Sequence, residues 1–147
     1  MAVLIVGSIA YDSVRSPEGS IDRALGGSAT YGGLSCRFVQ NLSKEGTTGL
    51  VGVVGEDFAE NDRYVLSSAG LNLAGLEVAE GETFRWEGSY QGAMAEAETL
   101  ATHLNVFEHF QPAVPAELAS PRVLFCANLH PDLQRSVMDQ TLSLIHI

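Results

Sequence analysis

The chain has 147 residues, of which 46 % are hydrophobic and 18 % are charged, which is typical of a folded globular domain and excludes a disordered chain. Its formal net charge is −10, and so acidic a surface argues against nonspecific binding to nucleic acid or anionic lipid. The apolar runs are too short for a signal peptide or a membrane span, which predicts a soluble, cytoplasmic protein.

The first third of the chain predicts a buried strand followed by a helix. Residues 3–6, Val-Leu-Ile-Val, form a continuous β-branched run of the kind that is buried on both faces of a parallel sheet. Residues 13–21 contain the turn formers of the next segment. Residues 26–30 then open a helix, and its apolar residues recur at helical spacing, which predicts that they form its inner face: Tyr31, Leu34, Phe38 and Leu42.

A second strand and helix follow. Residues 50–54 predict another strand buried on both faces. Asp57 is a candidate N-cap for a helix that ends near Gly70. One face of this helix is predicted to carry Phe58, Val65, Leu66 and Ala69.

The middle of the chain changes to strict alternation. In residues 83–90, Phe84 and Trp86 share one face with Tyr90, whereas Arg85 lies on the other. Residues 100–106 alternate again. Two such runs predict a small antiparallel sheet with two unlike faces, outside the buried parallel sheet.

The last third returns to the buried pattern. Residues 123–127 predict a third strand of the parallel sheet, and Asp132 is a candidate N-cap for a helix that carries Leu133 and Val137. The order of elements predicts an α/β fold with a doubly wound, mostly parallel sheet and a small appended β-sheet.

Three segments together resemble the PfkB, or ribokinase-like, family of carbohydrate kinases. They are residues 7–12 (Gly-Ser-Ile-Ala-Tyr-Asp), residues 26–33 (Gly-Gly-Ser-Ala-Thr-Tyr-Gly-Gly) and residues 51–58 (Val-Gly-Val-Val-Gly-Glu-Asp-Phe). Residues 83–86 and 124–128 also look like bacterial members. The resemblance implies that residues 1–141 are the N-terminal part of a kinase domain that is incomplete on its C-terminal side. It also implies that residues 12–25 and 83–107 hold the strands of an antiparallel β lid.

The resemblance implies a substrate site at the ends of the buried strands. Asp12 follows the first strand, where open α/β sheets place their ligands, and its carboxylate can accept hydrogen bonds from vicinal sugar hydroxyls. Gly26 and Gly27 allow backbone N–H groups to approach a ligand. Each of these residues can also serve only as a cap or a tight turn.

Three further residues complete the candidate set. Ser28 can donate to a substrate hydroxyl or cap the helix. Asn128 follows the third buried strand and can bind a hydroxyl or cap a turn. Arg85 contacts the substrate if the polar face of the lid covers it, and is a solvated surface residue otherwise.

The sequence departs from ribokinases at two polar positions. Ala10 stands where ribokinases carry an asparagine, and Tyr31 stands close to the place of a second asparagine. Two polar contacts to ribose are therefore missing. This favours a different sugar, a nucleoside or a sugar derivative as the substrate.

The family's catalytic motif, Gly-Ala-Gly-Asp at a helix N-terminus, does not occur in the sequence. The resemblance therefore implies a fragment that lacks the catalytic half, so no catalytic residue is assigned. ATP and Mg²⁺ are expected for a full-length member, with their binding residues outside this chain. Cys36 and Cys126 are predicted to be reduced thiols, and the four histidines show no metal-ligand spacing, so no metal site is predicted.

Two other functions remain open at this point. One is a noncatalytic sugar- or nucleotide-binding half-domain on the same fold. The other is a Rossmann domain of an oxidoreductase, which is disfavoured because residues 7–12 lack the GxGxxG spacing. The resemblance also implies a homodimer formed through the lid of the full-length protein. Residues 142–147 lack a helix stop signal and are interpreted as a foreign or truncated tail.

Overall fold

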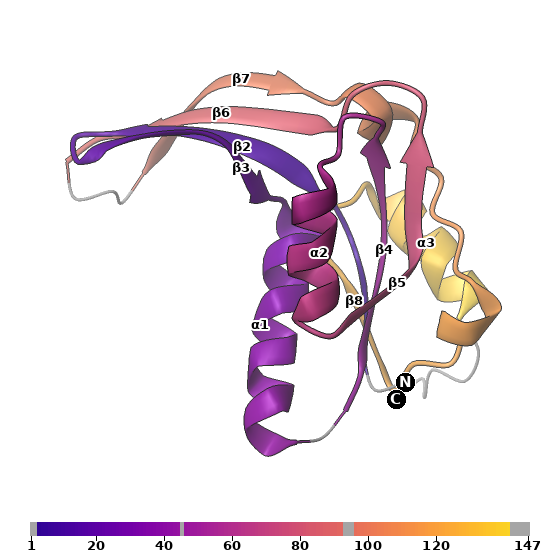
Figure 1. The fold of residues 1–147 in the computed structure, drawn as a ribbon. Helices are drawn as coiled ribbons and strands as arrows, with labels where there is room; N and C mark the ends of the chain where they lie inside the picture. The colour runs from indigo at the N-terminus through magenta and orange to yellow at the C-terminus, as the bar shows by residue number, and fades with distance from the viewer. Residues whose placement is uncertain (1–2, 45, 93–95, 142–147) are drawn as a thin grey trace.

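The computed structural model describes residues 3–44, 46–92 and 96–141. Its larger part is a parallel sheet with strand order β5-β4-β1-β8, and the strands are β1 (Val3–Val6), β4 (Thr48–Gly55), β5 (Leu71–Ala79) and β8 (Val123–Cys126). Helices α1 (Ser28–Ser43) and α2 (Glu60–Ser68) lie on one side of this sheet and α3 (Pro131–Gln140) on the other (Figure 1). The predicted doubly wound α/β fold is confirmed. The tail predicted at residues 142–147 lies outside the described residues.

The parallel sheet is buried on both faces because its two central strands carry only apolar residues and glycines apart from Thr48. In β1, Ile5 packs into the cluster beneath α1 and α2, whereas Leu4 and Val6 pack into a second cluster with Val137 of α3. All eight residues of β4 are buried. Continuous apolar runs are therefore the correct signal for these two strands.

The two edge strands differ from the sequence prediction. β5 was not predicted, because Asn72, Gly75 and Glu77 interrupt its apolar residues and its pairing with β4 shifts register near Gly49. β8 was predicted to be buried, yet Val123 and Phe125 are about half exposed. The reason is that β8 is an edge strand that pairs only with β1 among the described residues.

Helix α1 begins where it was predicted, but of the four residues predicted for its inner face only Leu34 packs against the core. Its buried residues are the small ones, Ala29, Thr30 and Gly33, whereas Phe38 and Leu42 are 67 % and 72 % exposed. A Cβ atom at position 33 would lie 2.9 Å from the Leu50 side chain. The helix therefore packs too closely on the sheet for large residues to fit between them.

The predicted caps of the two other helices are also wrong. Ala59 is the N-cap of α2, and Asp57 instead accepts hydrogen bonds from the backbone N–H and the hydroxyl of Thr83, both at 2.7 Å. The side chain of His130 caps α3 by accepting from the N–H of Asp132. Leu133 and Val137 do face the core as predicted.

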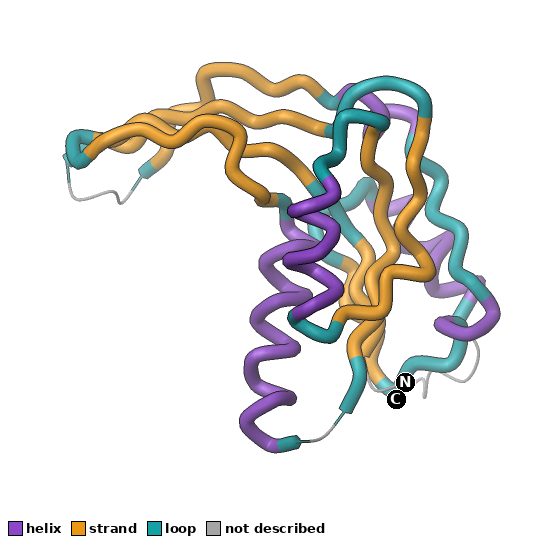
Figure 2. Tube along the Cα trace, in the orientation of Figure 1, coloured by secondary structure: helices purple, strands orange, loops and turns teal. Residues whose placement is uncertain are grey.

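The second sheet projects from the carboxyl end of the parallel sheet as a lid (Figure 2). Its order is β3-β2-β6-β7, with strands β2 (Ala10–Ser16), β3 (Gly19–Gly26), β6 (Phe84–Tyr90) and β7 (Ala97–His103). The outer pairs are antiparallel, but the central pair β2–β6 is parallel, so the lid is a mixed sheet. The turn predicted at 13–21 shrinks to residues 17–18, and the strand predicted at 100–106 begins earlier and ends at His103.

No helix among the described residues is long and apolar enough to cross a membrane. His, Cys, Asp and Glu side chains do not gather there in groups of three or more that could hold a metal ion.

Candidate functional site

The floor of the candidate site is formed by the segments after β1 and β8, where the order of strand addition in the parallel sheet reverses. From β1 the chain builds outward to β4 and β5 and then returns to the opposite side of β1 with β8. Ser8 follows the end of β1, and Asn128 follows the end of β8. In open α/β sheets, ligands bind in the crevice outside the carboxyl ends of the strands at such a switch point.

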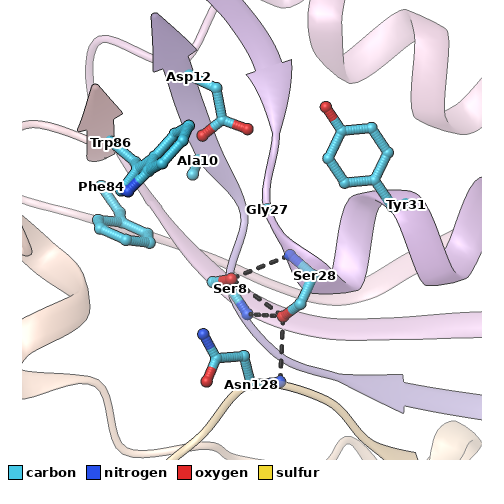
Figure 3. A pocket seen from close by; sticks show the side chains of 9 residues that line it. All are labelled: Ser8, Ala10, Asp12, Gly27, Ser28, Tyr31, Phe84, Trp86 and Asn128. Carbon is cyan, nitrogen blue, oxygen red and sulfur yellow. Dashed lines mark hydrogen bonds between the residues drawn. The ribbon is translucent and has the colours of Figure 1, made fainter. Parts of the chain in front are cut away.

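Ser28 joins the segments of this floor. Its Oγ accepts hydrogen bonds from the backbone N–H of Ser8 at 3.3 Å and of Asn128 at 3.2 Å, and it lies 3.0 Å from the Ser8 Oγ. The Ser8 hydroxyl in turn accepts from the Ser28 N–H at 3.0 Å (Figure 3). Ser28 therefore connects β1, the N-terminus of α1 and the segment after β8.

The glycine pair connects β3 to α1, and each glycine is required there for a different reason. Gly27 is the N-cap of α1 with φ 96° and ψ 152°, a region that essentially only glycine occupies. A Cβ atom there would lie 2.5 Å from the carbonyl oxygen of Ser8. Gly26 lies against the Asp12 carboxylate, so a side chain at position 26 would displace that carboxylate.

Asp12 reaches into the space above this floor from β2, next to a register shift in the pairing of β2 with β3. Burial raises the pKa of its carboxyl above the ordinary value, and a hydrogen bond from the Gly27 backbone N–H offsets part of that effect. The alternative role weighed for Asp12, a cap, is thus partly realised, since it accepts from the N-cap residue of α1. Figure 3 shows the carboxylate directed toward the cavity.

Two aromatic residues of β6 face the same space. The indole Nε1 of Trp86 donates to the Thr99 hydroxyl at 3.2 Å, and the ring lies over Gly88, where a Cβ atom would overlap it. The Phe84 ring stacks on Phe107 with 5.4 Å between ring centroids. Both rings are thus held in place by the lid and its neighbours.

Tyr31 is a third aromatic residue at the site, and the sequence prediction placed it in the core instead. It is 57 % exposed at the start of α1. Partial burial raises the pKa of its hydroxyl, and the charge of Asp12 raises that pKa further. Its helical spacing with Leu34 indicated a core position, whereas its place near that of a substrate-contacting asparagine of ribokinases was the signal for a role at the site.

Together these residues enclose an open cavity of ≈ 230 Å³. The side chains and backbone that line it come from the segment after β1, from β2, from the start of α1, from β6 and from the segment after β8: Ser8, Ala10, Asp12, Gly27, Ser28, Tyr31, Phe84, Trp86 and Asn128 (Figure 3). Such a cavity offers a carboxylate and an amide for hydroxyl groups, and aromatic faces for apolar ring surface.

Gly26 and Arg85 are the two candidate residues that do not line this cavity, although Gly26 lies against the Asp12 carboxylate that does. Because side chains alternate along β6, Arg85 lies on the opposite face from Phe84 and Trp86. There it forms an ion pair with Glu82 at 2.7 Å and lines a smaller hollow with Tyr11 and Arg23. The aromatic face of the lid, rather than the polar one, covers the cavity.

Comparisons with known proteins agree with a ribokinase-like fold. No protein-family model and no curated protein matches the sequence. Among solved structures, a Burkholderia thailandensis nucleoside kinase in complex with inosine is similar with a TM-score of 0.65 and 17 % identity, over 82 % of this chain and 42 % of that one. A ribokinase from Cryptococcus neoformans var. grubii in complex with ADP is similar with a TM-score of 0.60 and 19 % identity, over 83 % of this chain and 40 % of that one.

A third similar structure is a nucleoside kinase from Methanocaldococcus jannaschii, described as an archaeal member of the ribokinase family. It has a TM-score of 0.60 and 17 % identity, and the match covers 98 % of this chain and 50 % of that one. The chain therefore has a ribokinase-like fold, and it spans half or less of the length of these three kinases.

Proposed function

We propose that this chain is the substrate-binding part of a PfkB-family kinase that transfers a phosphoryl group from ATP to a hydroxyl of a sugar or nucleoside. Residues 1–141 are then the N-terminal part of the kinase domain. The full-length enzyme is cytoplasmic and uses ATP and Mg²⁺, which this chain's own residues do not hold. A homodimer formed through the lid is part of the same proposal.

The observation that carries the proposal is the position of Asp12. Its carboxylate is partly buried, with Gly26 against it and the Gly27 N–H bonded to it, and it borders the cavity above the switch point. A buried carboxylate is costly unless it has hydrogen-bond partners, and vicinal hydroxyl groups supply two donors to such a group. The resemblance of residues 7–12 and 26–33 to the family gives the same role to this residue.

The roles of the other candidates follow from their contacts. The Asn128 side chain borders the cavity from the end of β8 and is proposed to bind a second hydroxyl. Gly26 and Gly27 have no side chains, so the substrate can approach the backbone at these positions. Ser28 positions the floor through its bonds to Ser8 and Asn128 and is proposed to contact the substrate only secondarily. The proposal does not use Arg85.

Exposed apolar surface supports the view that more of the fold belongs with this chain. Phe38 and Leu42 of α1 are more than half exposed, and Val123 and Phe125 of the edge strand β8 are about half exposed. Soluble proteins rarely leave so much apolar surface uncovered. A noncatalytic half-domain that binds the same ligands is the second candidate, and it is favoured only by the lack of the Gly-Ala-Gly-Asp motif in the sequence.

The test is a kinase assay on the gene extended to full length. The 147-residue chain alone is expected to show no ATP-dependent phosphorylation, whereas the extended protein phosphorylates a member of a panel of sugars and nucleosides. Asp12→Ala should raise the substrate KM by roughly two orders of magnitude, because two charge-assisted hydrogen bonds of about 1.5–3 kcal/mol each are lost. The KM for ATP should change little.

Asp22→Ala is the matched control, because Asp22 lies on the neighbouring strand β3 and its exposed side chain forms an ion pair only with Arg15. It should leave both KM values unchanged. A folded Asp12→Ala enzyme with wild-type KM and kcat would show that Asp12 is only a cap of α1.

A further inference from the structure

We propose that the substrate is a neutral nucleoside, a sugar with a planar ring attached, rather than a free sugar or a sugar phosphate. This inference rests on the proposed function and narrows its substrate class. It follows from three properties of the cavity: its aromatic walls, its few free polar side chains and the sign of its charge.

The aromatic walls lie on two sides of the cavity. Trp86 and Phe84 come from β6 of the lid, and Tyr31 comes from α1. In Figure 3 the Tyr31 ring lies on one side of the Asp12 carboxylate, and the Trp86 and Phe84 rings lie on the other. A flat base can contact rings on both sides, whereas the sugar of the same molecule reaches Asp12 between them.

The rings of the lid are also held in fixed orientations. The indole of Trp86 rests on Gly88 and donates its N–H to Thr99 on β7, so its free face is directed into the cavity. Phe84 stacks on Phe107, and Phe107 stacks on the buried Phe110 with 5.9 Å between centroids. Rings that are fixed before binding lose little conformational freedom when a ligand stacks on them.

The polar side chains of the cavity are too few for a free sugar. Ser8 and Ser28 bond to each other and to backbone N–H groups. Their mutual bond uses one hydroxyl proton, so one serine O–H, Asp12, Asn128 and the Tyr31 hydroxyl remain for the ligand among the lining residues. A free sugar has a hydroxyl group on nearly every carbon, and each one that is buried without a partner weakens binding. A nucleoside replaces one of these hydroxyls with an apolar ring face.

The charge of the cavity argues against a ligand that is already phosphorylated. Its lining includes the Asp12 carboxylate and neither lysine nor arginine. A phosphate group placed there would meet a like charge without a compensating cation from the described lining residues. Arg85, the neighbour of Phe84 and Trp86 on β6, lies on the opposite face and pairs with Glu82.

The sequence supplies a direct reporter, because Trp86 is the only tryptophan of the chain. The 147-residue chain is titrated with inosine, ribose and inosine 5′-monophosphate while its tryptophan fluorescence is recorded, and the same titrations are repeated by calorimetry. Inosine should change the fluorescence saturably and bind at least about tenfold more tightly than ribose, since one base–aromatic stack contributes that much. It should also bind more tightly than the monophosphate, whose phosphate group meets the like charge of Asp12.

Variants assign the effect to the rings. Tyr31→Leu and Trp86→Leu, measured by calorimetry, should each weaken inosine binding by roughly tenfold and leave ribose binding unchanged. Trp86→Phe keeps a ring on Gly88 and should weaken inosine binding less than Trp86→Leu does. Tyr64→Leu is the matched control, because Tyr64 is an exposed tyrosine on α2 that does not line the cavity; it should bind like wild type.

The two levels of the proposal fail differently. If ribose binds as tightly as inosine and Asp12→Ala abolishes both, the proposed function stands and the nucleoside inference is wrong. The inference is equally wrong if the monophosphate binds best, or if Tyr31→Leu and Trp86→Leu bind inosine like wild type. If neither inosine nor ribose binds to the folded chain, the proposed substrate site itself is wrong.

Discussion

The side chains of the floor and the lid of the cavity differ in whether they are bonded within the protein or face the cavity. On the floor, the hydroxyls of Ser8 and Ser28 bond to each other and to backbone N–H groups. On the lid, the Asp12 carboxylate and the faces of Phe84 and Trp86 border empty space. The floor groups mainly maintain the fold, and the lid groups are available to a ligand.

This difference gives a rule for substitutions. Changes in the floor should lower the free energy of unfolding, whereas changes at the ligand-facing groups of the lid should alter binding and cost little stability. Natural proteins often keep recognition groups in environments that do not favour folding. The following variants test the rule, from the largest expected effect on stability to the smallest.

Gly27→Ala should be the most damaging floor substitution. It combines a backbone conformation that only glycine adopts readily with a Cβ position 2.5 Å from the Ser8 carbonyl oxygen. We expect a loss of roughly 3 kcal/mol or more in the free energy of unfolding, measured by urea denaturation.

Gly92→Ala is its control, because Gly92 also has a positive φ, 57°, but has open space around its Cβ position. It should cost only about 1–2 kcal/mol. Equal losses in the two variants would mean that the contact with Ser8 plays no part, and that the floor is less tightly built than the distances indicate.

Ser28→Ala should have the next largest effect. It removes the acceptor of two backbone N–H groups, those of Ser8 and Asn128. Leaving them without this partner should cost about 1–3 kcal/mol. Ser43→Ala, at an exposed hydroxyl that donates to the Gln40 carbonyl near the end of the same helix, should change stability by about 0.5 kcal/mol or less.

A Ser28→Ala chain as stable as wild type would contradict this division between floor and lid. The decisive measurement is the difference between the urea unfolding midpoints of the two serine variants, determined at the same pH.

The parts that the sequence predicted are those where a local pattern is sufficient. Continuous apolar runs identified β1 and β4, and alternation in residues 83–90 identified β6. Asn128, which follows the end of β8, borders the cavity, and so does Asp12, which lies within β2 rather than at a strand end. The strand predictions succeed because burial on both faces or on one face leaves a direct record in residue order.

The parts that it missed depend on tertiary packing. Tyr31 and Phe38 of α1 have the spacing of a core face, but close packing of Gly33 on Leu50 turns that face outward. Alternation separates Phe84 from Arg85 without telling which of the two faces the substrate. β5 was not predicted, because an edge strand tolerates polar residues and a glycine that interrupt its apolar pattern. No local pattern in the sequence contains this information.

Asp57 anchors the lid to the parallel sheet, and its effect depends on pH. Its Oδ1 accepts two bonds from Thr83 before β6, and its Oδ2 lies 3.2 Å from the Arg23 guanidinium of β3. Burial alone would raise the pKa of Asp57, but the Thr83 bonds and the charge of Arg23 outweigh it, so the pKa lies below its ordinary value. Ionised Asp57 thus stabilises the folded state.

The direction in which the stability contributed by Asp57 changes with pH follows from its lowered pKa. A depressed folded-state pKa gives stability that is fully present above the unfolded value of about 3.9 and is lost as the pH falls through the folded value. Asp57→Asn should therefore be less stable than wild type at pH 7, and the gap should narrow below about pH 4. Urea midpoints of both proteins across this range are the measurement; a gap that stays constant with pH would mean that the charge of Asp57 does not contribute.

Asp12→Asn should have the smallest effect on stability and the opposite sign. Burial raises the pKa of Asp12, and the Gly27 N–H compensates only in part, so the ionised carboxylate opposes folding. A raised folded-state pKa means that the contribution favours folding below the unfolded pKa of about 3.9 and is lost as the pH rises through the folded value. Asparagine keeps an acceptor for Gly27 and carries no charge. The variant should therefore unfold at a higher urea concentration than wild type at pH 7, and the two midpoints should converge below about pH 4.

The same variant should bind the substrate more weakly, because a neutral amide is a poorer acceptor for hydroxyl groups than a carboxylate. Higher stability together with weaker binding would identify Asp12 as a recognition group held against the preference of the fold. If Asp12→Asn instead lowers the midpoint at pH 7, then Asp12 belongs with the floor residues, and its bond to the start of α1 is its main role.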